Sequence, residues 1–104
     1  MDLSYIINQL GEEREQYFNA VAPPIIPTSN FAFNSVEKLR NGISDEFEST
    51  LYSRGNNPTL DILRKKLAAL DGAEDALVFS SGVAAMSIPV IANIEKGDHV
   101  ICVN

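Results

Sequence analysis

The stretch LVFSSGVAAMS, residues Leu77–Ser87, decides the fold expected for this chain. It passes from a short apolar run into small residues and then into a segment with the composition of a helix. A continuous apolar run such as residues 75–80 is typical of a strand buried on both faces. We therefore predict a strand over residues 75–80, followed at once by a helix from Gly82 to about Ile94.

A second apolar run, residues 99–104, follows that helix after the turn EKGD. Two strands joined by a helix form a right-handed parallel unit, so the predicted class is α/β. Pro89 lacks a backbone N–H and is expected to kink the helix. A parallel pair covered by one helix leaves a face of the sheet open. We therefore expect these 104 residues to be the front of a longer protein, with an independent domain as the alternative.

Shorter helices are predicted upstream. Four apolar side chains recur at helical spacing before Gly11, which is a plausible C-cap: Leu3, Ile6, Ile7 and Leu10. The segment from Ser35 to Gly42 has a serine N-cap and a glycine at its end. Residues 43–57 show no clear period and are interpreted as a loop.

Asn57 and Pro58 open a longer helix that should end at Gly72. Its apolar residues share one face: Leu60, Leu63, Leu67 and Leu70. Its basic residues lie on the other face: Arg64, Lys65 and Lys66.

Between the first two helices runs an apolar arm, residues 19–35, in which three prolines forbid a helix and disfavour a central strand. The prolines are Pro23, Pro24 and Pro27, and the large apolar residues are Val21, Ile25, Ile26, Phe31 and Phe33. Leaving such side chains in water costs about 1.5–3 kcal/mol each. Because this chain offers little surface to receive them, we expect a partner subunit to cover the arm.

The charge balance excludes one class of partner. The net charge is −6, from 14 acidic and 8 basic side chains, whereas phosphate backbones are bound by clustered Lys and Arg. Nucleic acid is therefore not expected. The acidic residues are interpreted as solvated surface: Glu12, Glu13, Glu15, Asp45, Glu46 and Glu48.

The remaining composition indicates a protein of the cytoplasm. A single cysteine, Cys102, cannot form an internal disulfide, and its apolar neighbours favour a buried structural thiol over a nucleophile. The N-terminus has neither a basic start nor a long apolar core, so no secretory signal is predicted. No stretch approaches the ~20 apolar residues of a membrane span.

The turn Ser80-Ser81-Gly82 is the first candidate site. Small residues let backbone N–H groups approach a ligand, and the first N–H groups of a helix lie at the positive end of its dipole. Such a turn binds anions, most often phosphate. The alternative is that Gly82 only permits the turn and the serines only cap the helix. Neither a Walker motif nor the dinucleotide fingerprint is present.

Tyr52 and Arg54 form the second candidate. In extended chain, alternate residues point to the same side, and a guanidinium beside a phenol suits a phosphate group. The alternative is that Arg54 pairs with a nearby carboxylate while Tyr52 packs on the surface.

Taken together, these stretches resemble the Cys/Met-metabolism family of pyridoxal-phosphate (PLP) enzymes, which includes cystathionine γ-synthase, cystathionine β- and γ-lyases, methionine γ-lyase and O-acetylhomoserine sulfhydrylase. The similarity rests on APPIIPTSNFAF, on YSRGNNPTLDILRKKLAALDGAEDALVFSSGVAAM and on KGDHVI. It covers nearly the whole chain, in the family's order and spacing.

The resemblance implies PLP as cofactor, held at its phosphate by the backbone N–H groups of Gly82 and Val83. Where Val83 stands, the family commonly has Met or Leu. It further implies that Tyr52 and Arg54 reach the phosphate of a neighbouring subunit, with Tyr52 also acting in substrate activation, in a homotetramer built from two dimers. No metal is implied. The lysine that the family uses to hold PLP has no counterpart among the lysines present: Lys38, Lys65, Lys66 and Lys96.

The implied fold is the N-terminal part of a type I aminotransferase-like PLP fold. Residues 1–57 would form an arm and helices that contact other subunits, and residues 58–104 the truncated start of the PLP-binding large domain. The implied reaction is elimination or replacement at the β- or γ-carbon of sulfur-containing amino acids or homoserine esters. Two alternatives stay open: a non-catalytic remnant that only binds a partner subunit, and a standalone phosphate-binding α/β domain.

Overall fold

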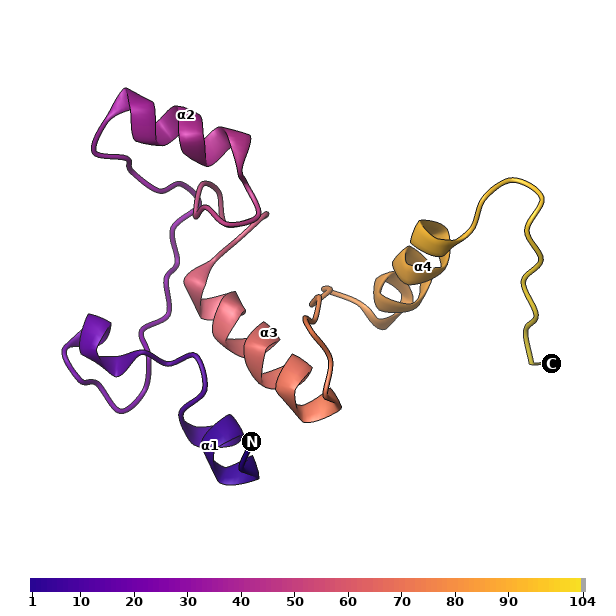
Figure 1. The fold of residues 1–104 in the computed structure, drawn as a ribbon, viewed down its shortest axis with the longest axis horizontal. Helices are drawn as coiled ribbons and strands as arrows, with labels where there is room; N and C mark the ends of the chain where they lie inside the picture. The colour runs from indigo at the N-terminus through magenta and orange to yellow at the C-terminus, as the bar shows by residue number, and fades with distance from the viewer. Residues whose placement is uncertain (104) are drawn as a thin grey trace.

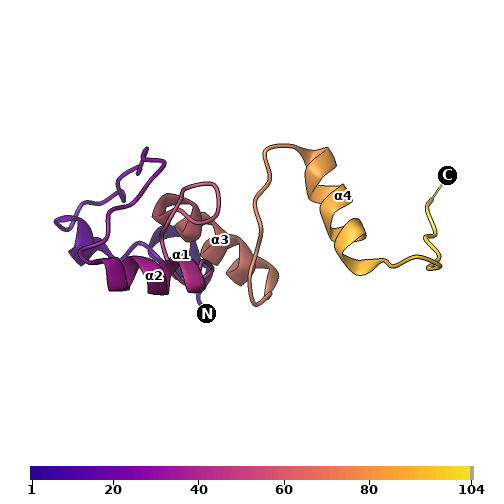
Figure 2. The ribbon, with the colours of Figure 1, turned by 90° about the horizontal axis from the view of Figure 1, so that it is seen from above.

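The computed structural model describes residues 1–103 of the chain. Its elements, in order, are helix α1 (Leu3–Asn8), the short 3₁₀-helix η1 (Arg14–Tyr17), and helices α2 (Val36–Ser44), α3 (Pro58–Asp71) and α4 (Gly82–Asn93). The elements up to α3 cluster together, whereas α4 and the segment after it stand apart (Figure 1). The view from above shows the same separation, with an extended connection between α3 and α4 (Figure 2).

The predicted parallel sheet does not form within residues 1–103. Residues 75–80 are extended and residues 99–103 irregular, and neither segment has a strand beside it. The described part contains one isolated antiparallel bridge, between Asn30 and Tyr52. A strand is defined by its ladder of backbone bonds, and the two segments leave opposite ends of α4 without turning back on each other (Figure 1). The α/β class is therefore not seen in this structure.

The starts of α2, α3 and α4 are those predicted, because a side chain caps each of these helices; η1 was not predicted and has no such cap. The side chain of Ser35 accepts from the Lys38 N–H at 3.2 Å, and that of Asn57 accepts from the Thr59 N–H at 2.9 Å. Gly72 ends α3 in the left-handed conformation that glycine adopts without strain (φ +66°).

Two helix ends differ from the prediction. Helix α1 stops at Asn8, before Leu10, and the left-handed Gly11 (φ +76°) belongs to the turn that follows. Gly42 lies inside α2, which continues to Ser44. A Cβ at Gly42 would lie 2.9 Å from Cε1 of Phe33, so a glycine here admits the aromatic ring of the arm against the helix. Gly42 therefore serves packing and not helix termination.

The core is small and lies between α1 and α3. The buried hydrophobic side chains of the described residues are Ile6 and Ala68. The leucine face of α3 does not line this core: Leu63, Leu67 and Leu70 are 40–50% exposed. Helix α3 meets α1 through the side that carries Ala68.

Charged groups hold the N-terminal segment on α3. Glu12 is buried, at 7% exposure, which corrects its prediction as solvated surface. Its carboxylate accepts from Lys66 Nζ of α3 at 2.6 Å and from Arg14 Nη2 at 2.8 Å. Lys66 also donates to the Ile7 carbonyl at 2.8 Å. Two residues that composition alone would place in solvent therefore link α1 and η1 to α3.

Most large apolar side chains stay exposed. In the arm, Val21 and Ile25 are about 80% exposed, whereas Ile26, Phe31 and Phe33 are largely covered by their own chain, which receives more of the arm than was expected. Helix α4 passes through Pro89 without ending and presents apolar groups all round, with Val83 70% exposed. The thiol of Cys102, predicted to be buried, is exposed. None of the helices in residues 1–103 has the length and apolarity needed to span a membrane.

Candidate functional site

Tyr52 and Arg54 lie together, through a turn and not through extended chain. The N–H groups of Gly55 and Asn56 both donate to the Tyr52 carbonyl, at 2.9 and 3.1 Å. The turn brings Arg54 Nη2 within 3.3 Å of the Tyr52 hydroxyl and sets the guanidinium carbon 5.3 Å from the ring centroid. A guanidinium over an aromatic face is held by cation–π attraction. The predicted pairing of the two side chains is thus present, with a different backbone beneath it.

The Arg54 guanidinium forms no ion pair within residues 1–103. The alternative of a structural salt bridge with a nearby acid is therefore not realised. Both Tyr52 and Arg54 are exposed, so the N–H groups of the guanidinium and the phenol hydroxyl are open to a ligand. This pair has the donors needed to bind an anion.

The arm anchors the turn from one side. The Ser53 N–H donates to the Ser29 carbonyl at 2.9 Å, and the Phe31 N–H donates to the Leu51 carbonyl at 3.3 Å. These bonds flank the Asn30–Tyr52 bridge. Tyr52 is therefore held where the arm crosses the segment that leads into α3.

The second half of the site is the N-terminus of α4. The Ser81 hydroxyl accepts from the Ala84 N–H at 3.2 Å, and the Ser81 carbonyl accepts from the Ala85 N–H at 3.1 Å. The N–H groups of Gly82 and Val83 have no partner among the described residues. Ser81 is thus the cap that the alternative interpretation required, and two donors still remain free.

Space around Gly82 is open: none of residues 1–103 comes within 4 Å of the position that a Cβ would take. Neither packing nor backbone conformation within this chain requires a glycine there, since its φ is not in the left-handed region. The missing side chain leaves room for a group from outside the described residues to reach the two free N–H groups.

The two halves do not meet within one chain. The turn bearing Tyr52 and Arg54 lies beside the start of α3, and α4 stands at a distance from it (Figure 1). An anion bound to the N–H groups of α4 could not contact Arg54 of the same chain in this arrangement. The two predicted sets of donors are each formed, but separately.

A cavity of about 330 Å³ lies on another side of the same turn, lined by Glu46, Phe47, Glu48, Gly55, Asn56, Arg64 and Asp75. Its one cation, Arg64, is already engaged: it pairs with Asp61 and Asp75 and donates to the Ala76 carbonyl at 2.8 Å. The N–H of Ala76 and the Arg64 guanidinium lower the pKa of Asp75. An acidic cavity whose arginine already bonds two carboxylates and a carbonyl does not suit a phosphate group. Nor does any group of three or more acidic, His or Cys side chains in residues 1–103 have the geometry to hold a metal ion.

Sequence reasoning missed the side chains that support the turn. Ser53, Asn57 and Thr59 bond to the backbone of the arm. Asn57 was predicted only as a helix cap. The signal that could have found these residues is the polar run SRGNNPT beside an arm whose carbonyls need donors.

Comparison with known proteins gives two findings. Residues 5–104 match the model of a family described as Cys/Met metabolism PLP-dependent enzyme. Individual relatives span several activities within that description. A putative cystathionine gamma-lyase 2 of Caenorhabditis elegans is 40% identical over 94 residues, which is 89% of this chain and 22% of the relative.

Two bacterial relatives are similar at the same level. An L-methionine gamma-lyase of Treponema denticola is 36% identical over 84 residues, covering 81% of this chain and 21% of the relative. An O-acetyl-L-homoserine sulfhydrylase 1 of Thermus thermophilus is 38% identical over 78 residues, which cover 75% of this chain and 18% of the relative. The chain therefore spans about a fifth of the length of these curated relatives.

Proposed function

The chain belongs to the Cys/Met-metabolism family of PLP-dependent enzymes, and we propose from this that it supplies the phosphate-binding part of a PLP site. In this proposal Gly82 and Val83 bind the phosphate through their backbone N–H groups. Tyr52 and Arg54 bind the phosphate of a neighbouring subunit. The observation that carries the proposal is the set of unused donors: two free N–H groups at α4 and a guanidinium without a carboxylate.

The donor set fits a phosphate dianion. Arginine bonds two phosphate oxygens with a planar fork, and a phenol hydroxyl or a backbone N–H serves a third. Hydrogen bonds to a charged group contribute about 1.5–3 kcal/mol each. These four groups therefore provide an anchor at one end of the cofactor, and the positive end of the α4 dipole adds to it.

Binding across a subunit interface is supported by the separation of the two halves. Because Arg54 and the α4 N-terminus lie apart in one chain (Figure 1), a shared phosphate requires two copies. The exposed arm residues Val21 and Ile25 provide apolar surface for the contact that would bring the copies together. We therefore propose a homo-oligomer in which each site takes donors from two chains, and a tetramer of two dimers as its form.

The proposed reaction is elimination or replacement at the β- or γ-carbon of a sulfur-containing amino acid or homoserine ester. When bound, PLP withdraws electrons from the α-carbon of an amino-acid substrate. This chain would orient that chemistry by fixing the phosphate, and Tyr52, whose hydroxyl already bonds Arg54, would take part in substrate activation. None of its lysines matches the lysine that holds PLP, so we propose that the chain alone is inactive.

Arg54→Ala tests the proposal, with Arg40→Ala as its matched control. Arg40 is exposed on α2 and forms no ion pair within residues 1–103, so both variants lose one positive charge. The variants are made in the full-length protein, and the PLP that the purified protein retains on dialysis is measured from its absorbance. Loss of charge-assisted bonds of the strength given above predicts at least about a tenfold fall in PLP affinity for Arg54→Ala and none for Arg40→Ala. Equal retention by the two variants would contradict the proposed role of Arg54.

A further inference from the structure

One side chain, Asn57, joins three separate segments of the chain. Its Oδ1 accepts from the Thr59 N–H at 2.9 Å and so caps α3. Its Nδ2 donates to the Ile26 carbonyl of the arm at 3.0 Å and to the Ser53 hydroxyl at 2.9 Å. Ser53 lies between Tyr52 and Arg54, so Asn57 links the helix start, the arm and the turn.

Two hydroxyl groups extend this link. The Ser53 hydroxyl, which accepts from Asn57, itself donates to the Thr28 carbonyl of the arm. On the other side, the Thr59 hydroxyl accepts from the Ile26 N–H at 2.9 Å. Ile26 therefore has both backbone groups bonded to side chains at the start of α3, although it lies 31 residues from Asn57 in the sequence.

Among the residues that are good N-caps, asparagine alone provides this combination of bonds. An asparagine amide offers an acceptor for the cap and two donors for the links, whereas aspartate accepts only and serine has a single donor. Aspartate is as good an N-cap as asparagine. The two roles of Asn57, capping and linking, can therefore be separated by a substitution that adds no atoms and keeps the helix start.

We infer that Asn57 is a positioning residue that holds the Tyr52–Arg54 turn against the arm and so sets the direction of the guanidinium. The other constraints on the turn are the bonds of Ser53 and Phe31 to the arm, the bond from Asn56 Nδ2 to the Phe47 carbonyl at 3.4 Å, and the bonds within the turn itself. Without the donors of Asn57, the Ser53 hydroxyl and the Ile26 carbonyl lose their shared partner. The arm is then held to the turn by fewer bonds, those at Ser53 and Phe31, and opens more readily. The consequence for phosphate rests on the proposed function; the coupling of arm and turn does not.

A second consequence concerns assembly. The exposed arm residues Val21 and Ile25 lie on the same segment that Asn57 binds through Ile26. A subunit that covers the arm would therefore hold in place the turn that, in the proposed function, reaches that subunit's cofactor. Asn57 is the connection between the two.

The test is Asn57→Asp, with Asn41→Asp as control, in the purified protein with PLP. Asn41 is exposed on α2 and its side chain forms no hydrogen bond within the described residues, so the control adds the same charge without breaking a link. Hydrogen exchange is followed by mass spectrometry in peptides covering residues 24–32, 50–56 and 60–71. The rate at which PLP dissociates, and the ³¹P signal of bound PLP, are measured in parallel.

For Asn57→Asp we expect exchange at least about tenfold faster in residues 24–32 and 50–56, with α3 unchanged because its cap remains. We also expect faster release of PLP and a shifted ³¹P signal, which a purely structural loss elsewhere would not produce. Asn41→Asp should match the wild type in each measurement. Unchanged hydrogen exchange in residues 24–32 of Asn57→Asp would overturn the inference. So would a tenfold faster exchange in those residues together with an unshifted ³¹P signal, in protein that retains PLP. Failure of the proposed function is recognised separately, as unchanged PLP retention in Arg54→Ala.

Discussion

Replacing Glu12 by Gln should release the N-terminal segment from α3. The substitution removes the carboxylate charge at almost constant volume and leaves two cations, Lys66 and Arg14, facing a neutral amide. Glu12 bonds Lys66, which lies 54 positions further along the chain. This long-range bond, and not the local one to Arg14, is expected to carry the structural effect.

The free energy lost in Glu12→Gln follows from how exposed the paired side chains are. The side chains of Glu12 and Lys66 are 9% and 19% exposed, whereas that of Arg14 is 37% exposed. Half-exposed ion pairs contribute little, because water screens them. Hydrogen bonds between charged groups contribute about 1.5–3 kcal/mol, and we take the lower end because water reaches one side of the cluster. The expected loss of about 1.5 kcal/mol corresponds to roughly tenfold faster local opening.

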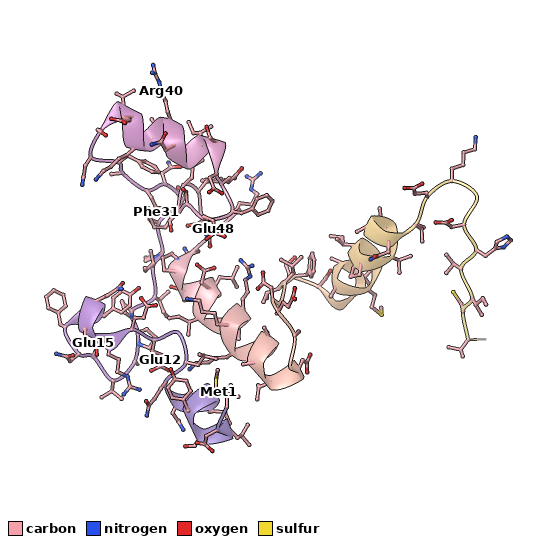
Figure 3. The ribbon with its side chains drawn as sticks, viewed as in Figure 1. Met1, Glu12, Glu15, Phe31, Arg40 and Glu48 are labelled. Carbon is pink, nitrogen blue, oxygen red and sulfur yellow. The ribbon has the colours of Figure 1, made fainter. Side chains whose placement is uncertain are left out.

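Hydrogen exchange of α1, Leu3–Asn8, measures that opening, since Ile6 is the side chain that α1 buries. Glu15→Gln is the matched control: it makes the same charge change on η1, where the Glu15 side chain is exposed and lies away from α3 (Figure 3). Exchange in α3 reports whether the helix itself is intact. If Glu12→Gln and Glu15→Gln exchange alike in α1, the ion cluster does not hold this segment and the reasoning is refuted.

Three further results are expected. The hydrogen bonds from Lys66, and then from Arg14, lower the pKa of Glu12. The ionised Glu12 carboxylate therefore stabilises the fold above the ordinary carboxyl pKa, and this stabilisation is lost as pH falls below about 4.5 and through the lowered pKa. Hydrogen exchange of α1 should therefore rise on acidification in the wild type and not in Glu12→Gln. Gly42→Ala gains about 1 kcal/mol of helix propensity but places a methyl group 2.9 Å from the Phe33 ring. Because the ring must move away from α2, chymotrypsin should cleave the chain faster after Phe33. An unchanged cleavage rate would show that the packing of the ring does not need the glycine. In the full-length protein, which would carry both this sequence and the PLP-holding lysine, mixing inactive Arg54→Ala subunits with inactive subunits in which that lysine is replaced should restore part of the activity, because a hybrid has one intact site. No recovery in a verified hybrid would argue against donors shared between chains.

Local chemistry determined the features that the sequence predicted correctly. Ser35, Asn57 and Ser81 each cap a helix through their own side chain, within two or three residues. Gly72 ends α3 for an equally local reason. The pairing of Tyr52 with Arg54 was also predictable, because two residues so close in sequence meet in either a turn or an extended segment.

The sequence also identified the family. The motifs around Tyr52, Arg54 and Gly82 have the order and spacing of the Cys/Met-metabolism enzymes, and the family match over residues 5–104 bears this out. Their roles at the phosphate stay predictions, which the variants above test. The strand segments were recognised as apolar runs, but a strand needs a neighbour, and within residues 1–103 neither run has one.

What only the tertiary structure decided is which groups meet across long stretches of chain. Periodicity placed the leucines of α3 on one face and its cations on the other, and in the structure Lys66 bonds the buried Glu12 while Leu63 and Leu67 remain exposed. The sequence predicted Asn57 as a helix cap, whereas the structure shows that its amide also donates to the arm and to the turn. A helical pattern shows which side chains share a face but not which face finds a partner. That choice depends on contacts between residues 31 to 54 positions apart, which no local pattern encodes.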